Sequence, residues 1–353
     1  MAKVFTANVK SVLSGDTLIL TSPNNPGLER TFSLAFVSAP RLNKDGDEPF
    51  AFRSRDFLRS IAIGKLVQCT VLYTIPSSQR DYGTVKIKDG PDLPDAPVKA
   101  GWLKVREDAG KKEESEEALQ RLENLRNFEG QAKNEGKGLW AGTGGTIEVQ
   151  NDLGGPNFMK EWKGKTVEAI IERVFTGDRV LVRLLLSEKK HVQVMTLVAG
   201  IRTPATERVN QATGVKQAGE EYGKEAQQFV EQRLLQRQLK VFIAGASPQG
   251  QLVAEILHPR GNIAVFLLEE GFARCNDFHS TMLGEKMATL RAAEKKAQEA
   301  KKRLHKHHVT KTAESNLDMT VTKVIGADTI IVRNKAGTEK RYVPAFRLRQ
   351  RPG

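Results

Sequence analysis

Aspartate recurs in one short sequence context at three places in the chain. Asp16, Asp178 and Asp328 each follow a small residue in a turn between two runs rich in β-branched and apolar residues. The turn reads Ser-Gly-Asp-Thr at the first place and Thr-Gly-Asp-Arg at the second. A short carboxylate side chain in such a turn can accept hydrogen bonds from the turn itself. The pattern therefore favours a structural carboxylate, and leaves a chemical role open.

A second group of oxygen-bearing side chains lies at residues 43–48, Asn-Lys-Asp-Gly-Asp-Glu. This loop is acidic enough to bind a cation, but it lacks the ligand spacing of an EF-hand loop. The second half of the chain offers Glu207, Glu220, Glu221 and Glu225 in the equivalent region. Acidic side chains in loops are usually solvated, so catalytic use of either group is the weaker interpretation.

Positive charge exceeds negative charge. The 353 residues include 55 Lys and Arg against 42 Asp and Glu, a formal net charge of +13. A basic chain favours polyanionic partners, because neutralising phosphates releases their condensed counterions. A charged, solvated surface is the alternative that charge alone leaves open. Cys69 and Cys275 are the only cysteines, which excludes a disulfide framework and a cysteine-based zinc site.

The expected cellular compartment follows from the targeting and membrane-spanning segments that the sequence lacks. Residues 1–5 show no apolar secretory segment, and no apolar run approaches the roughly 18 residues of a membrane-spanning helix. We therefore expect a soluble protein of the cytoplasm and also of the nucleus, with no membrane partner.

The expected elements occur twice in the same order. The first copy contains strands at 4–12, 18–21 and 31–37, a helix at 49–63, strands at 67–72 and 84–87, a helical turn at 96–101 and a long helix at 115–134. The second contains strands at 167–174, 180–186 and 192–199, a helix at 222–236, strands at 239–244 and 252–257, and helices at 263–270 and 287–305. This order predicts a small barrel with helices packed against it, a fold that commonly holds oligonucleotides.

The domain boundaries follow from these copies. We expect a first repeat at 1–141, a linker at 142–165, a second repeat at 166–310 and the truncated start of a third at 317–353. The expected linker contains Gly, Asn and Pro and has no periodic apolar face. The fold class is α+β, with tandem barrels of five strands and three helices each.

The order of elements, the Gly-Asp turn and Thr203-Pro204 resemble the staphylococcal nuclease fold, a five-stranded oligonucleotide/oligosaccharide-binding barrel with three helices. The two copies resemble the first two repeats of the Tudor staphylococcal nuclease family, RNA-associated transcription coactivators and components of the RNA-silencing complex (RISC). The stretches that carry the resemblance are EPFAFRSRDFL at 48–58, RLLQR at 233–237, ILHPRGNI at 256–263 and EGFARC at 270–275. It covers about residues 3–335.

The resemblance also allows a check of the catalytic positions. The bacterial enzyme cleaves phosphodiesters around one Ca²⁺, with two carboxylates on the metal, a glutamate for the water and two arginines for the phosphate. The first metal aspartate matches Asp16 and Asp178. The other four positions fall on Ser33, Ser38, Arg41 and Thr84 in the first copy and on Leu197, Arg202, Ala205 and Gln251 in the second. Asp16 and Asp178 are thus residual candidates for catalysis and for metal binding, and no cofactor is required unless the chain is a Ca²⁺-dependent nuclease.

The replacements change the charge from negative to positive, because Arg41 and Arg202 stand where the bacterial enzyme has acids. The hypothesis is that the old cleft binds phosphate instead of cleaving it. The candidate RNA-binding residues are Arg41, Arg53, Arg55, Arg59, Arg80, Arg202, Arg208, Lys216 and Lys224. We expect structured or double-stranded RNA and small RNAs as partners, recognised by shape, together with silencing-complex or transcription proteins.

Two alternatives stay open. The chain is a divergent Ca²⁺-dependent RNA endonuclease if another constellation supplies the missing groups, so its status as an enzyme is undecided. The basic side chains are structural if they pair with nearby acids such as Asp56 and Glu221.

Overall fold

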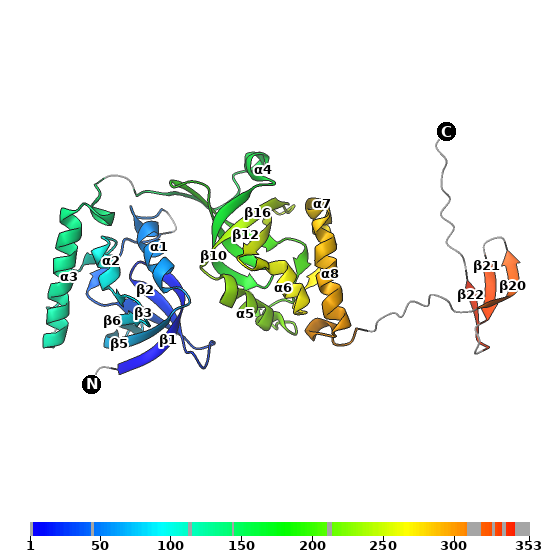
Figure 1. The fold of residues 1–353 in the computed structure, drawn as a ribbon, viewed down its shortest axis with the longest axis horizontal. Coiled ribbons are helices and arrows are strands. Elements are labelled where there is room, and N and C mark those ends of the chain that lie inside the picture. Colours follow the sequence, from blue (N-terminus) through cyan, green and yellow to red (C-terminus); the bar gives the residue numbers. More distant parts are fainter. Residues whose placement is uncertain are drawn as a thin grey trace. The chain divides into compact units, whose positions relative to one another are not determined.

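A computed structural model describes residues 3–43, 46–111, 115–142, 145–209, 214–308, 319–326, 329–333 and 337–342. The chain divides into two compact units, Met1–Lys306 and His307–Gly353. The first unit holds two barrels, and the second holds a small sheet (Figure 1). No described helix is long and apolar enough to cross a membrane.

The first barrel contains five strands that close on themselves. They are β1 (Lys3–Ser14), β2 (Thr17–Thr21), β3 (Glu29–Leu34), β5 (Leu66–Ile75) and β6 (Arg80–Ile87). The order β3-β2-β1-β5-β6 is antiparallel, and a parallel pairing of β3 with β6 closes the barrel. Gly83 lies at this closure, where an added Cβ would come within 1.9 Å of the Thr70 carbonyl oxygen. Glycine is required there because the strands approach too closely for a side chain.

The remaining elements of the first copy cover this barrel. They are α1 (Ala51–Ala62), α2 (Asp95–Lys99), α3 (Glu116–Asn134), the short strands β4 (Val37–Ser38), β7 (Asp92–Leu93) and β8 (Lys104–Val105), and the 3₁₀ turn η1 (Gly138–Trp140). The α3 helix begins where its sequence predicts, because the Ser115 side chain accepts a hydrogen bond from the Ala118 N–H as an N-cap. Leu122 and Leu125 of α3 are buried in the core of the first barrel.

The second barrel repeats the first. Its strands are β10 (Thr166–Thr176), β11 (Arg179–Leu185), β12 (Lys190–Val198), β16 (Gln238–Ala246) and β17 (Leu252–His258). They have the same order, and a parallel β12–β17 pairing closes the barrel. Its helices are α5 (Gly223–Leu234), α6 (Ile263–Glu269), α7 (Ser280–Leu283) and α8 (Lys286–Glu299). The expected fold class, two tandem five-stranded barrels with helices, is confirmed.

Short pieces complete the second copy. They are β13 (Ile201–Arg202), β14 (Arg208–Val209), β15 (Lys216–Gln217), β18 (Gly261–Asn262), β19 (Arg274–Cys275), η2 (Asp277–His279) and η3 (Arg303–His305). The last long helix ends earlier than its sequence predicts: α8 ends at Glu299, and the backbone turns at Lys301 with φ of 50°. The Leu304 N–H then donates to the Gly271 carbonyl. This contact competes with continuation of the helix, and the helical sequence pattern does not reveal it.

The region between the barrels is more structured than its composition indicates. It contains β9 (Glu148–Gln150), which pairs in parallel with β12, and α4 (Pro156–Trp162). Phe158 of α4 is buried in the core of the second barrel. A three-residue strand and a helix of two turns are too short to show a periodic apolar face, so this part of the expected linker read as irregular.

The second unit contains a three-stranded antiparallel sheet of β20 (Thr320–Gly326), β21 (Thr329–Arg333) and β22 (Glu339–Tyr342). Its first hairpin has two register shifts, at the same places as the first hairpins of both barrels. Such bulges are specific features of a fold, so this hairpin is built like the start of the other two copies. Asp328 lies outside the described residues.

Helix α1 lies on the side of the first barrel that faces the second (Figure 1). Polar contacts join the two barrels there. Arg55 Nη2 donates to the Glu172 carboxylate at 2.5 Å, and Arg59 Nη1 donates to the Gln236 carbonyl at 2.8 Å. The Gln236 side chain also exchanges two hydrogen bonds with the backbone of Val12, at 2.6 and 3.0 Å. Every one of these contacts links the first barrel to the second.

A further part of this contact surrounds Phe52 of α1. The Arg183 guanidinium lies 4.1 Å from the Phe52 ring centroid, and the His191 ring centroid lies 4.7 Å from it. Arg183 Nε donates to His191 Nδ1 at 3.0 Å, and Asp47 is the ion-pair partner of Arg183. Burial, assisted by Arg183 and Arg55, lowers the pKa of His191 to about 4. The imidazole therefore stays neutral at pH 7, and the junction is electrically balanced.

The buried pair of Arg55 and Glu172 generates a stability prediction. Glu172→Ala is expected to reduce the free energy of unfolding by about 3–5 kcal/mol, because it leaves a buried guanidinium without its counter-charge. Glu168→Ala removes an exposed acid from the same strand, and its effect should stay within about 0.5 kcal/mol. Urea unfolding followed by circular dichroism measures both variants, and equal losses would contradict the assignment.

Candidate functional site

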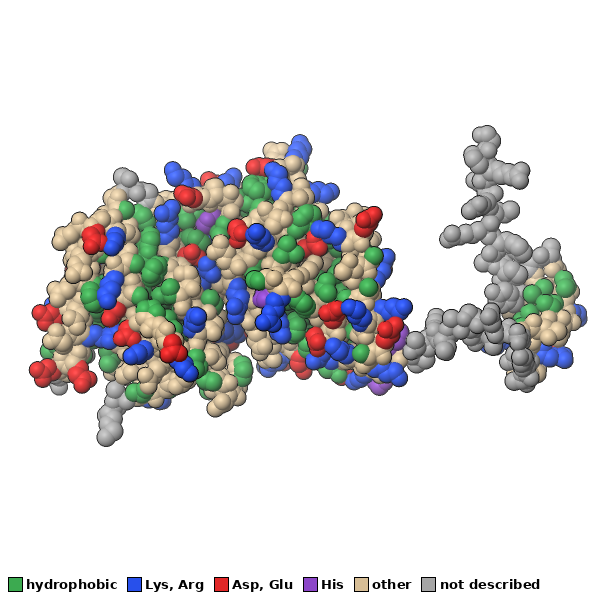
Figure 2. All heavy atoms as spheres, viewed as in Figure 1, with side chains coloured by type: hydrophobic (Ala, Val, Ile, Leu, Met, Phe, Trp, Pro, Cys, Tyr) green, Lys and Arg blue, Asp and Glu red, His purple; other side chains and the backbone are tan. Residues whose placement is uncertain are grey.

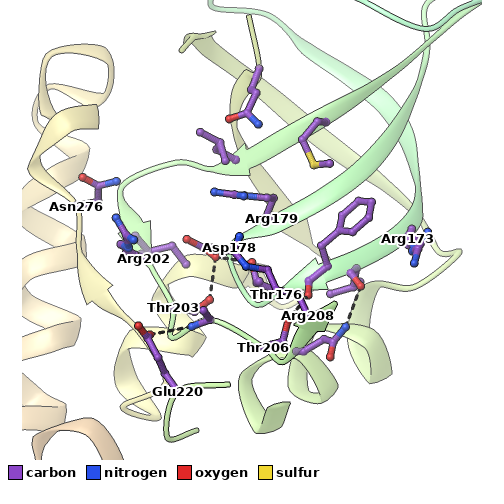
Figure 3. A pocket seen from close by; sticks show the side chains of 18 of the residues that line it. Arg173, Thr176, Asp178, Arg179, Arg202, Thr203, Thr206, Arg208, Glu220 and Asn276 are labelled. Atoms are coloured by element: carbon purple, nitrogen blue, oxygen red, sulfur yellow. Dashed lines mark hydrogen bonds between the residues drawn. The ribbon is translucent and has the colours of Figure 1, made fainter. Parts of the chain in front are cut away.

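A cleft of about 920 Å³ opens beside the Gly-Asp turn of the second barrel (Figure 3). Its walls come from the β10–β11 hairpin, the segment that follows β12 and the start of α5. The polar side chains that line it include Arg173, Thr176, Asp178, Arg179, Arg202, Thr203, Thr206, Glu207, Arg208, Glu220, Gln227, Gln251 and Asn276.

Asp178 is held by its own turn and by the chain after β12. Its Oδ1 accepts hydrogen bonds from the Thr176 hydroxyl at 2.6 Å and the Thr203 hydroxyl at 2.9 Å (Figure 3). The Asp178 carbonyl accepts from the Val198 N–H at 2.8 Å. Gly177 permits this contact, since an added Cβ would come within 2.8 Å of Thr203 Cγ2. The carboxylate therefore fastens the hairpin turn to the end of β12.

Asp16 has the same task in the first barrel. Its Oδ1 accepts from the Ser14 and Thr17 hydroxyls at 2.5 and 3.1 Å, and its Oδ2 accepts from the Ala39 N–H at 3.2 Å. Its carbonyl accepts from the Leu34 N–H at 2.8 Å. Hydrogen bonding within the turn accounts for both aspartates.

The residues that match the bacterial general base are used through their backbones. The Arg41 N–H donates to the Glu48 carboxylate at 2.8 Å, and the Glu48 N–H donates to the Arg41 carbonyl at 3.0 Å. Ala205 and Glu220 make the same reciprocal pair, with both distances 2.9 Å. Glu48 and Glu220 thus close equivalent loops. Sequence analysis missed this role, although the two acids stand just before equivalent helices.

The acids do not assemble into a cation site. Asp47 pairs with Arg183, and Glu221 pairs with Lys306. Throughout the described part of the chain, no three His, Cys, Asp or Glu side chains lie together in a way that could hold a metal ion. Asp178 shares the cleft with Glu207 and Glu220, but Glu220 is engaged with the Ala205 backbone. By the resemblance, Arg202 stands in the second carboxylate position. This donor set does not fit Ca²⁺, which takes six to eight oxygen ligands.

Arginine dominates the cleft instead. Arg173, Arg179, Arg202 and Arg208 line it with exposed side chains, and none forms an ion pair with a carboxylate among the described residues. Arg208 Nε donates to the Gln217 side chain at 2.6 Å. Sequence analysis had found Arg202 and Arg208 but missed the other two. The sequence contains a signal for these two arginines, because Arg173 and Arg179 flank the Gly-Asp turn at strand positions that face outward.

Most of each barrel, from its third strand onward, matches a known kind of domain. Residues 31–142 and 195–307 match the family described as staphylococcal nuclease homologue. The chain belongs to the staphylococcal nuclease homologue family. The resemblance found in the sequence is thereby confirmed. Each matched segment covers one barrel from its third strand onward, without the hairpin that carries the Gly-Asp turn.

Several curated relatives are similar to this chain in sequence. Staphylococcal nuclease domain-containing protein 1 of Schizosaccharomyces pombe is 34% identical over 356 residues, which cover 97% of this chain and 40% of that protein. The protein of the same name in Drosophila melanogaster is 31% identical, with shares of 94% and 37%. Ribonuclease TUDOR 1 of Arabidopsis thaliana is 27% identical, with shares of 93% and 39%. The chain spans about two fifths of the length of these relatives.

Within this staphylococcal nuclease homologue, two of the expected RNA-binding residues are corrected. Arg55 and Arg59 are only 7% and 4% exposed, and both are engaged at the junction of the barrels. A strand of RNA has no access to them there. The helical spacing indicates that both arginines are buried. Arg55 and Arg59 share a face of α1 with Leu58 and Ala62, which are buried.

The other predicted basic residues are distributed over the surface of the unit. Arg41, Arg53, Lys216 and Lys224 are exposed, and Arg80 is half-buried. Arg53 lines a small cavity with Phe50 and Trp102, away from the cleft. Basic and acidic side chains are interspersed over the face drawn in Figure 2. The cleft therefore brings together Arg202 and Arg208 from the predicted set, and adds Arg173 and Arg179.

The structural role of Asp178 can be tested by stability. Asp178→Ala is expected to lower the free energy of unfolding by about 1–3 kcal/mol, because two hydroxyl groups lose their acceptor. Asp178→Asn keeps a side-chain oxygen in the same place and should retain most of the stability. Chemical denaturation of both variants decides the matter. Unchanged stability in Asp178→Ala would show that the turn does not need this carboxylate.

Proposed function

We propose that the two barrels form an RNA-binding module and that the cleft of the second barrel holds phosphate groups. The observation that carries the proposal is the set of four exposed arginines around an aspartate already engaged in its own turn. Guanidinium groups donate paired hydrogen bonds to phosphate oxygens. Contacts of this kind position nucleic acid without reading its sequence.

Structured or double-stranded RNA, small RNAs included, is the proposed ligand. Duplex RNA is recognised through phosphates and shape, and aromatic residues make up only 6% of the chain, which disfavours extensive stacking on single strands. The resemblance to the Tudor staphylococcal nuclease family extends the proposal. The module would act as a scaffold in a transcription coactivator or RNA-silencing component, with proteins of those complexes as partners, in the cytoplasm and the nucleus.

A Ca²⁺-dependent RNA endonuclease is the second candidate. The name of one relative, Ribonuclease TUDOR 1, supports it, and Asp178 is the residue in the cleft that matches a metal ligand of the bacterial enzyme. Two features argue against it. No three acidic, histidine or cysteine side chains lie together among the described residues in a way that could hold a metal ion, and the residues at the other bacterial catalytic positions are of different types.

The cleft generates a binding prediction. Arg202→Gln is expected to weaken duplex RNA binding several-fold, and to reduce the slope of log K against log salt by about 0.7–0.9, the contribution of one phosphate contact. Lys160→Gln, an exposed charge on α4, is the matched control and should leave the slope nearly unchanged. Filter binding across a salt series without divalent ions gives both slopes. Equal slopes for the two variants would remove Arg202 from the interface.

Cleavage is tested separately. Labelled RNA incubated with the chain and Ca²⁺ is expected to stay intact, with no difference on adding a chelator, because the cleft lacks the carboxylates that a Ca²⁺ site needs. Gel electrophoresis of the products provides the measurement. Chelator-sensitive cleavage that disappears in the Asp16→Ala/Asp178→Ala double variant would establish the endonuclease instead.

A further inference from the structure

A second basic cavity, of about 950 Å³, lies on the second barrel beside α5 and α6. It shares no lining residue with the cleft. Arg233 and Arg237 reach it from the end of α5, and His258 and Arg260 reach it from the turn between β17 and β18. We call these four residues the α5 basic cluster. They come from two segments of the chain that the barrel fold brings together.

The α5 basic cluster makes no close ion pairs among the described residues. None of its three arginines forms an ion pair with a carboxylate in the described parts of the chain. Two acids that line the same cavity are occupied by other cations: Glu269 pairs with Lys296, and Glu270 pairs with Lys302 and Arg303. Glu225 is the remaining acid in the lining. The cavity thus gathers positive charge that the protein itself leaves largely unneutralised.

An aromatic stack positions this charge. The Arg233 guanidinium lies 3.5 Å from the Phe229 ring centroid, and the Phe229 and Phe272 centroids are 5.4 Å apart. Arg303 covers the other end, 4.2 Å from the Phe272 centroid. Stacking on a ring restricts a guanidinium while leaving its N–H edges free to donate. Arg233 is therefore oriented before any ligand arrives.

His258 adds a neutral donor to the cluster. Its Nδ1 accepts a hydrogen bond from the Arg260 N–H at 3.1 Å, which places the proton of the neutral ring on Nε2. Burial lowers the pKa of His258, and Arg237, Arg260 and Arg233 lower it further. An anion among these groups would have the opposite effect, since it favours the charged imidazolium.

We propose that the α5 basic cluster binds a phosphate group of RNA, as a second phosphate site outside the cleft. The proposal rests on the RNA-binding function proposed above. RNA is favoured over an acidic protein segment because the cavity and the cleft adjoin the same helix, so one phosphate backbone can reach both. Helix α5 connects the two places, since Gln227 lines the cleft and Gln228 lines the cavity. An RNA strand that crosses α5 would contact both.

Arg260→Gln tests the site by salt dependence. Arg260 is exposed in a turn, and its side chain makes no hydrogen bond or ion pair with the described residues. Folding should therefore be preserved, which thermal unfolding checks. Duplex RNA carrying a single-stranded extension should bind several-fold more weakly, with a salt slope reduced by about 0.7–0.9. Lys295→Gln on α8 removes a charge whose side chain is 75% exposed, and it should leave the slope nearly unchanged. Equal slopes for both variants overturn the proposal.

The His258 imidazole provides an independent readout. Titration of its ring signals by nuclear magnetic resonance should give a higher pKa with inorganic phosphate or RNA present, and a smaller rise in Arg260→Gln. Arg233, Arg237 and Arg260 act on the ring electrostatically. The other charged groups that line the cavity are Arg303, Glu225, Glu269 and Glu270. A His258 pKa that neither ligand changes overturns the proposal, and a rise with polyglutamate but not with RNA overturns it in favour of an acidic protein partner.

The two proposals fail in different ways. If Arg202→Gln weakens RNA binding while Arg260→Gln does not, the cleft remains the RNA site and the α5 basic cluster is excluded. If the unsubstituted chain does not bind RNA, both proposals fall. If both variants reduce the salt slope and their effects add, the two phosphate sites are supported together.

Discussion

The hydrogen bonds of the turn aspartate are the interaction on which the functional surface depends. Asp178 joins the hairpin of β10 and β11 to Thr203, just beyond the end of β12. That attachment sets the floor of the cleft and the direction from which Arg179 and Arg202 enter it. A carboxylate with two hydroxyl donors is well satisfied without a metal, so the turn can be kept while the rest of the catalytic set is replaced.

Replacement of that set changes the electrostatics of the cleft. In a metal-dependent nuclease, acids hold a cation and the cation meets the phosphate. Here arginines occupy the cleft directly, and Glu220 is used to close its loop through the Ala205 backbone. Guanidinium groups keep their charge at every accessible pH, so phosphate binding in such a cleft needs no bound ion. The same fold can in this way serve for binding where a relative serves for cleavage.

Tight packing of the two barrels determines which charges remain available. Arg55 and Arg59 hold Glu172 and the Gln236 carbonyl across the junction, and their burial makes them structural. The contacts of Arg55 and Arg59 across the junction also orient the second barrel against α1. The junction between the repeats therefore withdraws these two arginines from the basic side chains that a ligand could reach.

Sequence alone determined the repeated hairpin turns, the order of strands and helices, and the family. Local signals suffice for these, because turn chemistry and strand patterning act over a few residues. Tertiary structure decided the rest. It buried Arg55 and Arg59, ended α8 at Glu299, ordered α4 against the second core, and assembled Arg233, Arg237 and Arg260 from separate segments. Burial and charge clustering depend on which distant segments meet, and a linear pattern does not specify that.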